Sequence, residues 1–149
     1  MTRQDFLQRI SLGAAFVLTV PCLHSCKDDD AGPGMTEPPA GGVDLTVDLT
    51  DATVADDLDT RGYHIVEEVV VARRIDGQGF AAASVVCSHK ALKDVVYDDV
   101  VDRWVCLQHG AEFAIPDGRV LENPSTGPLS AALVVYEVTR EGDVLRVTS

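Results

Sequence analysis

The sequence predicts an all-β fold, an antiparallel sandwich or barrel, and three observations favour it. Valine is abundant, while aromatic residues make up only 5% of the 149-residue chain, and β-branched valine is typical of strands. Turn-forming residues recur every ~8–12 residues, a spacing typical of antiparallel sandwiches and barrels. No window has the sustained 3.6-residue period of an amphipathic helix. The core of such a fold would consist mostly of Val, Ala and Leu.

The first part of the predicted sheet begins with an alternating segment. In residues 43–49, Val and Leu alternate with Asp and Thr, which is typical of a strand with one buried face. Residues 63–66 continue this β-rich pattern. Residues 69–75 and 80–86 flank a DGQG turn, so they are predicted to form a hairpin.

The second part of the chain consists of shorter β-rich runs separated by turns. A PDG turn precedes residue 119, an ENPSTGP loop precedes a long apolar run, and an EGD turn precedes residue 144. The expected strands are 95–97, 103–106, 112–115, 119–121, 129–138 and 144–147.

Residues 1–25 are predicted to be a signal peptide. Arg3 and Arg9 give a basic start, and residues 10–20 form an apolar run that is too short to span a bilayer, which takes ~20 residues. The alternative, a buried core helix, has no amphipathic pattern or cap to support it. The segment also resembles a twin-arginine signal in which Gln4 replaces the second arginine, so the export route stays open.

The sequence LHSC at residues 23–26 resembles a bacterial lipobox, in which the cysteine is acylated and becomes the new N-terminus. We therefore expect lipidation at Cys26 and anchoring to a bacterial membrane, facing the periplasm or the cell surface. His24 departs from the usual small residue, and Cys22 is a competing site. Residues 26–42, rich in Pro and Gly, are predicted to be a flexible linker, and residues 43–149 the folded domain.

Length and charge exclude several classes of function. A length near ~150 residues argues for one domain. The formal net charge is −12, from 12 basic and 24 acidic residues. Nucleic-acid binding needs clustered Lys and Arg for phosphate contacts, so no nucleic-acid partner is expected. A polybasic membrane-surface mode is excluded for the same reason.

Two cysteines and two histidines form the most specific pattern in the folded part. Cys87 and His89 form a C-x-H block, and Cys106 and His109 form a C-x-x-H block 16 residues further on. Two thiolates and two imidazoles on two loops could hold a metal. A zinc-stabilised Cys2His2 binding module without redox activity is one alternative, and a Cys87–Cys106 disulfide with incidental histidines is another.

These blocks resemble the signature of the Rieske [2Fe-2S] protein family. The similarity extends to Gly110, to residues 118–121 (GRVL) and to the NPSTGPL segment at residues 123–129, which in the family covers the cluster. The resemblance implies a Rieske-type β-sandwich or barrel with a small cluster-binding subdomain. It also implies a [2Fe-2S] cofactor, with two cysteines on one iron and two histidines on the other.

By this resemblance, Cys87 and Cys106 bind the buried iron, while His89 and His109 bind the outer iron near the surface, where a redox partner protein would make contact. Neutral imidazoles raise the potential of such a cluster to ~ −150 to +300 mV, against ~ −400 mV for all-cysteine plant-type ferredoxins.

The sequence departs from the high-potential members of the family. Leu92 and Gln108 stand where those members have two disulfide-forming cysteines, and Ala111 and Phe113 stand where they have hydroxyl donors to the cluster. Hydrogen bonds to the sulfurs favour the reduced state, so their loss lowers the potential. We expect a ferredoxin-like protein in the lower part of the Rieske range.

The expected function is one-electron transfer in an exported, lipid-anchored protein. It would not be an enzyme on its own, although it could be a small subunit of an oxidoreductase; its donor and acceptor are not specified by the sequence. Several other residues receive structural interpretations. We expect His64 to be a surface or partly packed histidine, Trp104 a core residue, residues 56–59 an acidic loop, and Arg73, Arg74 and Arg103 solvated charges.

Overall fold

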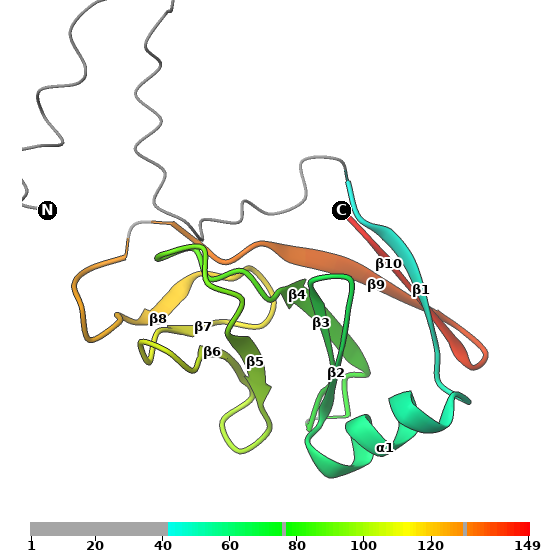
Figure 1. Cartoon of the computed structure of the whole chain (residues 1–149). Helices are drawn as coiled ribbons and strands as arrows, with labels where there is room; N and C mark the ends of the chain where they lie inside the picture. Colours follow the sequence, from blue (N-terminus) through cyan, green and yellow to red (C-terminus); the bar gives the residue numbers. More distant parts are fainter. Residues whose placement is uncertain (1–41, 76, 130) are drawn as a thin grey trace, which may run out of the picture. The chain divides into compact units, whose positions relative to one another are not determined.

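A computed structural model describes residues 42–75, 77–129 and 131–149 (Figure 1). The predicted signal peptide, the lipidation site Cys26 and the predicted linker up to Gly41 lie outside these residues. Within the described part of the chain, no helix is long and apolar enough to cross a membrane.

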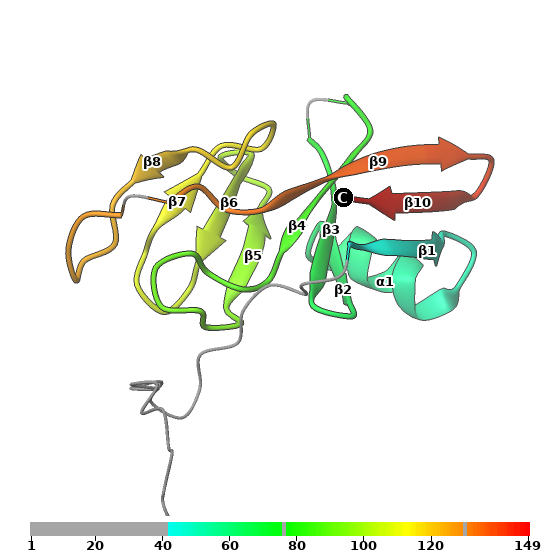
Figure 2. The same cartoon turned by 90° about the horizontal axis from the view of Figure 1, so that it is seen from above.

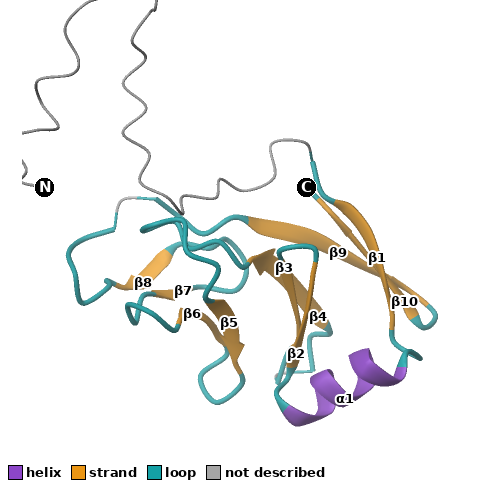
Figure 3. Ribbon diagram, in the orientation of Figure 1, coloured by secondary structure: helices purple, strands orange, loops and turns teal. Residues whose placement is uncertain are grey.

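Ten strands and one helix make up the described part of the chain (Figure 3). Their order is β1 (Asp44–Asp48), α1 (Ala52–Thr60), β2 (Tyr63–Val66), β3 (Val69–Arg73), β4 (Phe80–Ser84), β5 (Val95–Asp98), β6 (Arg103–Cys106), β7 (Glu112–Phe113), β8 (Val120–Glu122), β9 (Val135–Glu141) and β10 (Val144–Thr148). The fold is all-β with antiparallel pairing throughout, as the sequence predicts.

The strands form a six-stranded sheet in the order β1-β10-β9-β4-β3-β2 and a four-stranded sheet in the order β5-β6-β7-β8. In both Figure 1 and Figure 2, the four-stranded sheet lies on one side of β3 and β4, and β1 and β10 lie on the other. The predicted hairpin of residues 69–86 is confirmed, because β3 pairs with β4 from Val69↔Ser84 to Arg73↔Phe80.

β3 lies between two hydrophobic cores and contributes side chains to both. Val70 and Ala72 pack in the core that also contains the four-stranded sheet, whereas Val69 and Val71 pack in the core against α1, β1 and β10. All four side chains are fully buried. Burial on both faces explains the continuous apolar run. Each valine contributes up to ~1.5–3 kcal/mol of hydrophobic stabilisation.

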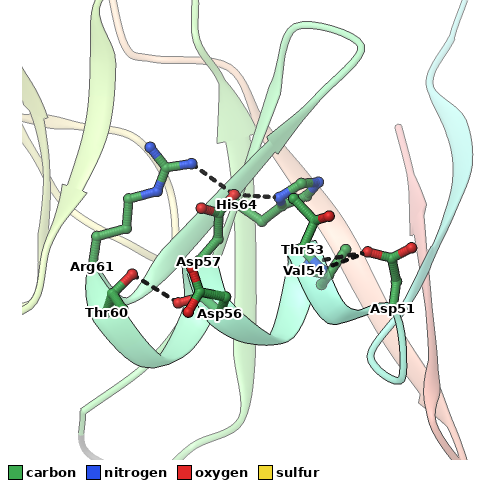
Figure 4. Close-up of polar contacts among 8 residues, drawn as sticks. All are labelled: Asp51, Thr53, Val54, Asp56, Asp57, Thr60, Arg61 and His64. Carbon is green, nitrogen blue, oxygen red and sulfur yellow. Dashed lines mark hydrogen bonds and ion pairs between the residues drawn. The ribbon is translucent and has the colours of Figure 1, made fainter.

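The expectation of an acidic loop at residues 56–59 is wrong, because this segment belongs to α1. Asp51 caps the helix, accepting hydrogen bonds from Thr53 N at 2.8 Å and Val54 N at 3.2 Å (Figure 4). Val54 and Leu58, four residues apart, are the buried face. A helix of nine residues with two buried positions is too short to give a clear period, although the Asp51 cap is a signal in the sequence.

The predicted strand at residues 129–138 begins later than expected. β9 starts at Val135, and residues 129 and 131–134 lie outside any strand. Leu133 is 2% exposed and its N–H donates to Gly118 O at 2.8 Å, so this part of the run is buried against a turn rather than paired in a sheet. The run is apolar for packing, and a short apolar run does not distinguish a strand from a buried loop.

Candidate metal centre

Two six-residue loops carry the predicted ligands. The first ligand loop, residues 87–92, lies between β4 and β5 and contains Cys87 and His89. The second ligand loop, residues 106–111, leads from the end of β6 towards β7 and contains Cys106 and His109. Sheet pairing explains part of their proximity, because Val95 lies opposite Cys106 in the β5–β6 register.

Both loops close with the same backbone hydrogen bonds. In the first, Cys87 N donates to Leu92 O at 2.7 Å and Ala91 N donates to Cys87 O at 2.8 Å. In the second, Cys106 N donates to Ala111 O at 2.8 Å and Gly110 N donates to Cys106 O at 2.9 Å. The fifth residue has a positive φ in each, +51° at Ala91 and +69° at Gly110. Each loop thereby turns back on its own cysteine.

The structure brings the four residues together as two pairs. Cys87 and Cys106 are free thiols that are 1% and 0% exposed, so a Cys87–Cys106 disulfide is not formed. The two thiols lie close enough that Cys106 raises the pKa of Cys87. The rings of His89 and His109 meet edge to face, with centroids 4.9 Å apart and an interplanar angle of 84°. Among the described residues, no three His, Cys, Asp or Glu side chains form a group that could hold a single metal ion.

Two unpaired ring nitrogens indicate which atoms of the imidazoles could bind a metal. The Nδ1 atoms of His89 and His109 are both buried, and neither has a hydrogen-bond partner. A buried polar atom left unpaired costs about 1–3 kcal/mol, so such atoms call for an explanation. Two imidazole nitrogens and two buried sulfurs on the same two loops match the donor set of a cluster with two cysteine and two histidine ligands.

The pKa shifts of Cys87 and His89 are also consistent with side chains that bind a metal. Burial and the neighbouring Cys106 raise the pKa of the Cys87 thiol to about 11, although the backbone N–H groups of His89 and Lys90 oppose this rise. Burial, followed by the nearby His109 and Lys90, lowers the pKa of His89. A neutral imidazole is the form that binds metal. A bound cation would supply the charge that a buried thiolate needs.

A third loop between β8 and β9, described at residues 123–129 and 131–134, is hydrogen-bonded to both ligand loops. Ser125 N donates to His109 O at 2.9 Å, Thr126 Oγ1 lies 3.2 Å from His89 Nε2, and Ser88 Oγ donates to Ala131 O at 3.0 Å. The family resemblance implies that this loop covers the site. The resemblance does not predict the contacts of Ser88 and Thr126, because these contacts depend on how the loops are placed in the fold.

The residues under the ligand loops are apolar. Trp104 is fully buried and packs edge to face against Tyr97 at 5.8 Å, so its expected role as a core residue is confirmed. Ala111 and Phe113 are also fully buried and carry no hydroxyl. These three side chains pack around Cys106 in one core.

Of the three arginines expected to be solvated charges, Arg73 and Arg103 are 46% and 42% exposed while Arg74 is only 18% exposed, and each pairs with a carboxylate. Arg73 contacts Asp59 at 2.6 Å, Arg74 contacts Asp102 at 2.8 Å, and Arg103 pairs with Glu112. These ion pairs join residues distant in sequence, which is why no local pattern predicts them. Pairs near the surface are worth ~0–1 kcal/mol each.

His64 is partly packed, as expected, and it belongs to a polar cluster away from the ligand loops. Its Nδ1 lies 2.7 Å from an oxygen of Asp57, and the same oxygen is 2.7 Å from Arg61 (Figure 4). Hydrogen bonds from His64 and Arg61 lower the pKa of Asp57. This cluster links α1 to β2 and takes no part in the candidate metal centre.

Comparisons with known proteins identify the family of this chain. The Rieske [2Fe-2S] domain family matches residues 47–138, which include both ligand loops and the third loop. The structure is similar to that of the cyanobacterial plasma membrane Rieske protein PetC3 from Synechocystis PCC 6803, with a TM-score of 0.51 and 25% sequence identity over 70% of this chain and 99% of the other. No curated protein sequence matches significantly. Because the family match covers more than half of the sequence, the chain belongs to the Rieske [2Fe-2S] family.

Proposed function

We propose that this protein transfers single electrons through a [2Fe-2S] cluster held by Cys87, Cys106, His89 and His109. The observation that carries this assignment is that the two ligand loops together hold two buried free thiols and two buried, unpartnered imidazole nitrogens. When bound, such a cluster supplies reversible one-electron chemistry at ~ −150 to +300 mV. The chain supplies no catalytic group of its own in this proposal.

The two pairs of side chains have different tasks. The cysteines lie in the apolar core, where the backbone N–H groups of His89 and Lys90 act against the rise in the Cys87 pKa and so favour its thiolate. The imidazoles are less buried than the thiols. They therefore lie on the side of the site that a redox partner protein can approach.

The potential should fall in the lower part of the Rieske range. Ala111 and Phe113 are fully buried and offer no hydroxyl to the site. Fewer hydrogen bonds to the sulfurs leave the more negative, reduced state less stabilised. Quinol oxidation at high potential is therefore not part of the proposal.

A redox titration followed by electron paramagnetic resonance tests this function. The purified protein should give a Rieske-type signal on reduction, with a midpoint in the lower part of the range above. A protein that binds one zinc and no sulfide while remaining folded would instead be a zinc-stabilised binding module.

We further propose that residues 1–25 direct export, that Cys26 carries a lipid anchor, and that residues 26–42 tether the domain of residues 43–149 to a bacterial membrane. PetC3, to which the fold is similar, is described as a plasma membrane protein. In this setting the protein would serve a larger oxidoreductase or a separate redox partner. Cys26→Ser should move the protein from the membrane fraction to the soluble fraction, while Cys22→Ser should not.

A further inference from the structure

The two histidines of the candidate metal centre have different surroundings. His89 Nε2 lies 3.2 Å from Thr126 Oγ1. Within the described residues, the His109 ring has no hydrogen-bond partner, and only its backbone oxygen is engaged, by Ser125 N at 2.9 Å. The residues beside His109 in the second ligand loop, Gln108 and Gly110, are exposed and uncharged.

Thr126 is presented to His89 by a defined turn. Gly127 N donates to Pro124 O at 3.2 Å, which closes a four-residue turn with Ser125 and Thr126 at its tip. Pro124 is buried, and the loop is tied down at its far end, where Ser88 Oγ donates to Ala131 O at 3.0 Å. The hydroxyl of Thr126 is therefore placed by the fold of the loop, although the residue itself is exposed.

We infer that Thr126 is a positioning residue that holds the His89 imidazole through Nε2 and makes the two histidines inequivalent. This inference rests on the proposed function. When Nδ1 of a neutral imidazole is a ligand, the ring proton resides on Nε2, so His89 Nε2–H donates to Thr126 Oγ1. A partner that accepts a hydrogen bond from Nε2–H fixes the ring orientation and makes the imidazole a more basic ligand.

A more basic ligand stabilises the oxidised metal more than the reduced metal. Thr126 therefore lowers the midpoint potential of the bound cluster, in the same direction as the missing hydroxyls at Ala111 and Phe113. Removal of this hydrogen bond should raise the potential. Its contribution is that of a single neutral hydrogen bond, about fivefold in the oxidation equilibrium, or ~40 mV at 59 mV per tenfold for one electron.

Three variants distinguish the effect of the Thr126 hydroxyl from the effect of other changes in the loop. Thr126→Val keeps the shape and removes the hydroxyl, Thr126→Ser keeps the hydroxyl, and Ser125→Ala changes the neighbouring side chain while leaving its backbone N–H on His109. Midpoint potentials at one fixed pH are measured on protein with full iron content. We expect a higher potential for Thr126→Val, and potentials equal to wild type for Thr126→Ser and Ser125→Ala.

Pulsed paramagnetic resonance on protein with 15N-labelled histidine provides a second readout. Wild type should give two distinct histidine nitrogen couplings, and Thr126→Val should change only one of them. An unchanged potential in Thr126→Val, an equal shift in Thr126→Ser, or two equivalent couplings in wild type would overturn the inference. Iron and sulfide content of wild type tests the proposed function separately, because protein without a cluster contradicts that function whatever the variants do.

Discussion

The two ligand loops have the same backbone hydrogen bonds but differ in the residues that they carry. Each cysteine N–H donates to the carbonyl five residues ahead, and each cysteine carbonyl accepts from the residue four ahead. The residue four after the cysteine has a positive φ in both loops, and it is Ala91 in the first loop and Gly110 in the second. The histidine also differs, two residues after Cys87 and three after Cys106.

The surroundings of the loops differ as well. The first loop contains Lys90 and is followed by Lys93, whose Nζ pairs with Glu68 at 2.6 Å. The second loop contains no charged residue from 106 to 111, and its Leu107 side chain is 68% exposed. The shared framework therefore depends on backbone hydrogen bonds and φ angles rather than on residue identity. Substitutions at matched positions test this comparison.

The largest effect is expected at the cysteines, where the two loops should behave alike. Cys87→Ser and Cys106→Ser each remove a thiolate, so both should lose the cluster. Iron and acid-labile sulfide per protein chain, with the visible spectrum, measure the loss. Ser88→Ala in the same loop is the control, since it removes only a hydrogen bond to Ala131 O. Full iron and an unchanged spectrum in Cys87→Ser would show that the ligand assignment is wrong.

At the histidines the expected change is one of potential. His109→Cys replaces a neutral imidazole by an anionic thiolate, so any cluster it retains should have a lower potential, towards the ~ −400 mV of all-cysteine plant-type ferredoxins. A redox titration against wild type checks the direction. A potential at or above that of wild type, with full cluster content, would contradict His109 as a ligand.

Gly110→Ala should destabilise the second loop without a steric clash. A Cβ at Gly110 would meet no atom within 4 Å, but its φ of +69° disfavours an L side chain. The left-handed conformation costs about 1–2 kcal/mol for such a residue, and denaturant unfolding measures the loss. Gly118→Ala is the contrasting control, since its Cβ would lie 2.0 Å from Leu133 O and the loss should be larger. Equal losses of unfolding free energy in the two variants would indicate that steric crowding at Gly118 does not contribute.

Ala91→Gly is the reciprocal change in the first loop and should have the smallest effect. Glycine removes the strain of the +51° φ but loses more chain entropy on folding, so a net gain of about 0.5–1 kcal/mol is expected. The same unfolding measurement applies. Destabilisation by this substitution would mean that Ala91 has a packing role that outweighs its backbone strain.

Much of the fold was predictable, because β-rich runs and turn residues give local signals. The hairpin of β3 and β4 and the strands β2 and β6 follow directly from the sequence. α1 was missed because its buried face consists of only Val54 and Leu58. The strand predicted from residue 129 was too long because Leu133 is apolar for its contact with the turn at Gly118.

The candidate site was predictable for a different reason. Cys87, His89, Cys106 and His109 lie in two short blocks whose spacing is itself specific, and the structure brings both pairs together. The contacts from the third loop were not predictable in detail. Thr126 lies 37 residues from His89 and Ser88 lies 43 residues from Ala131, so these contacts depend on how β8, β9 and the ligand loops are placed in space.

The most direct test of the account is the metal and sulfide content of the anaerobically purified protein, combined with paramagnetic resonance after reduction. The account predicts two irons and two acid-labile sulfides per chain, with a Rieske-type signal. A protein that arrives empty should give the same result after reconstitution with iron and sulfide. One zinc per chain with no sulfide, in a folded protein that still takes up no cluster on reconstitution, would contradict the account.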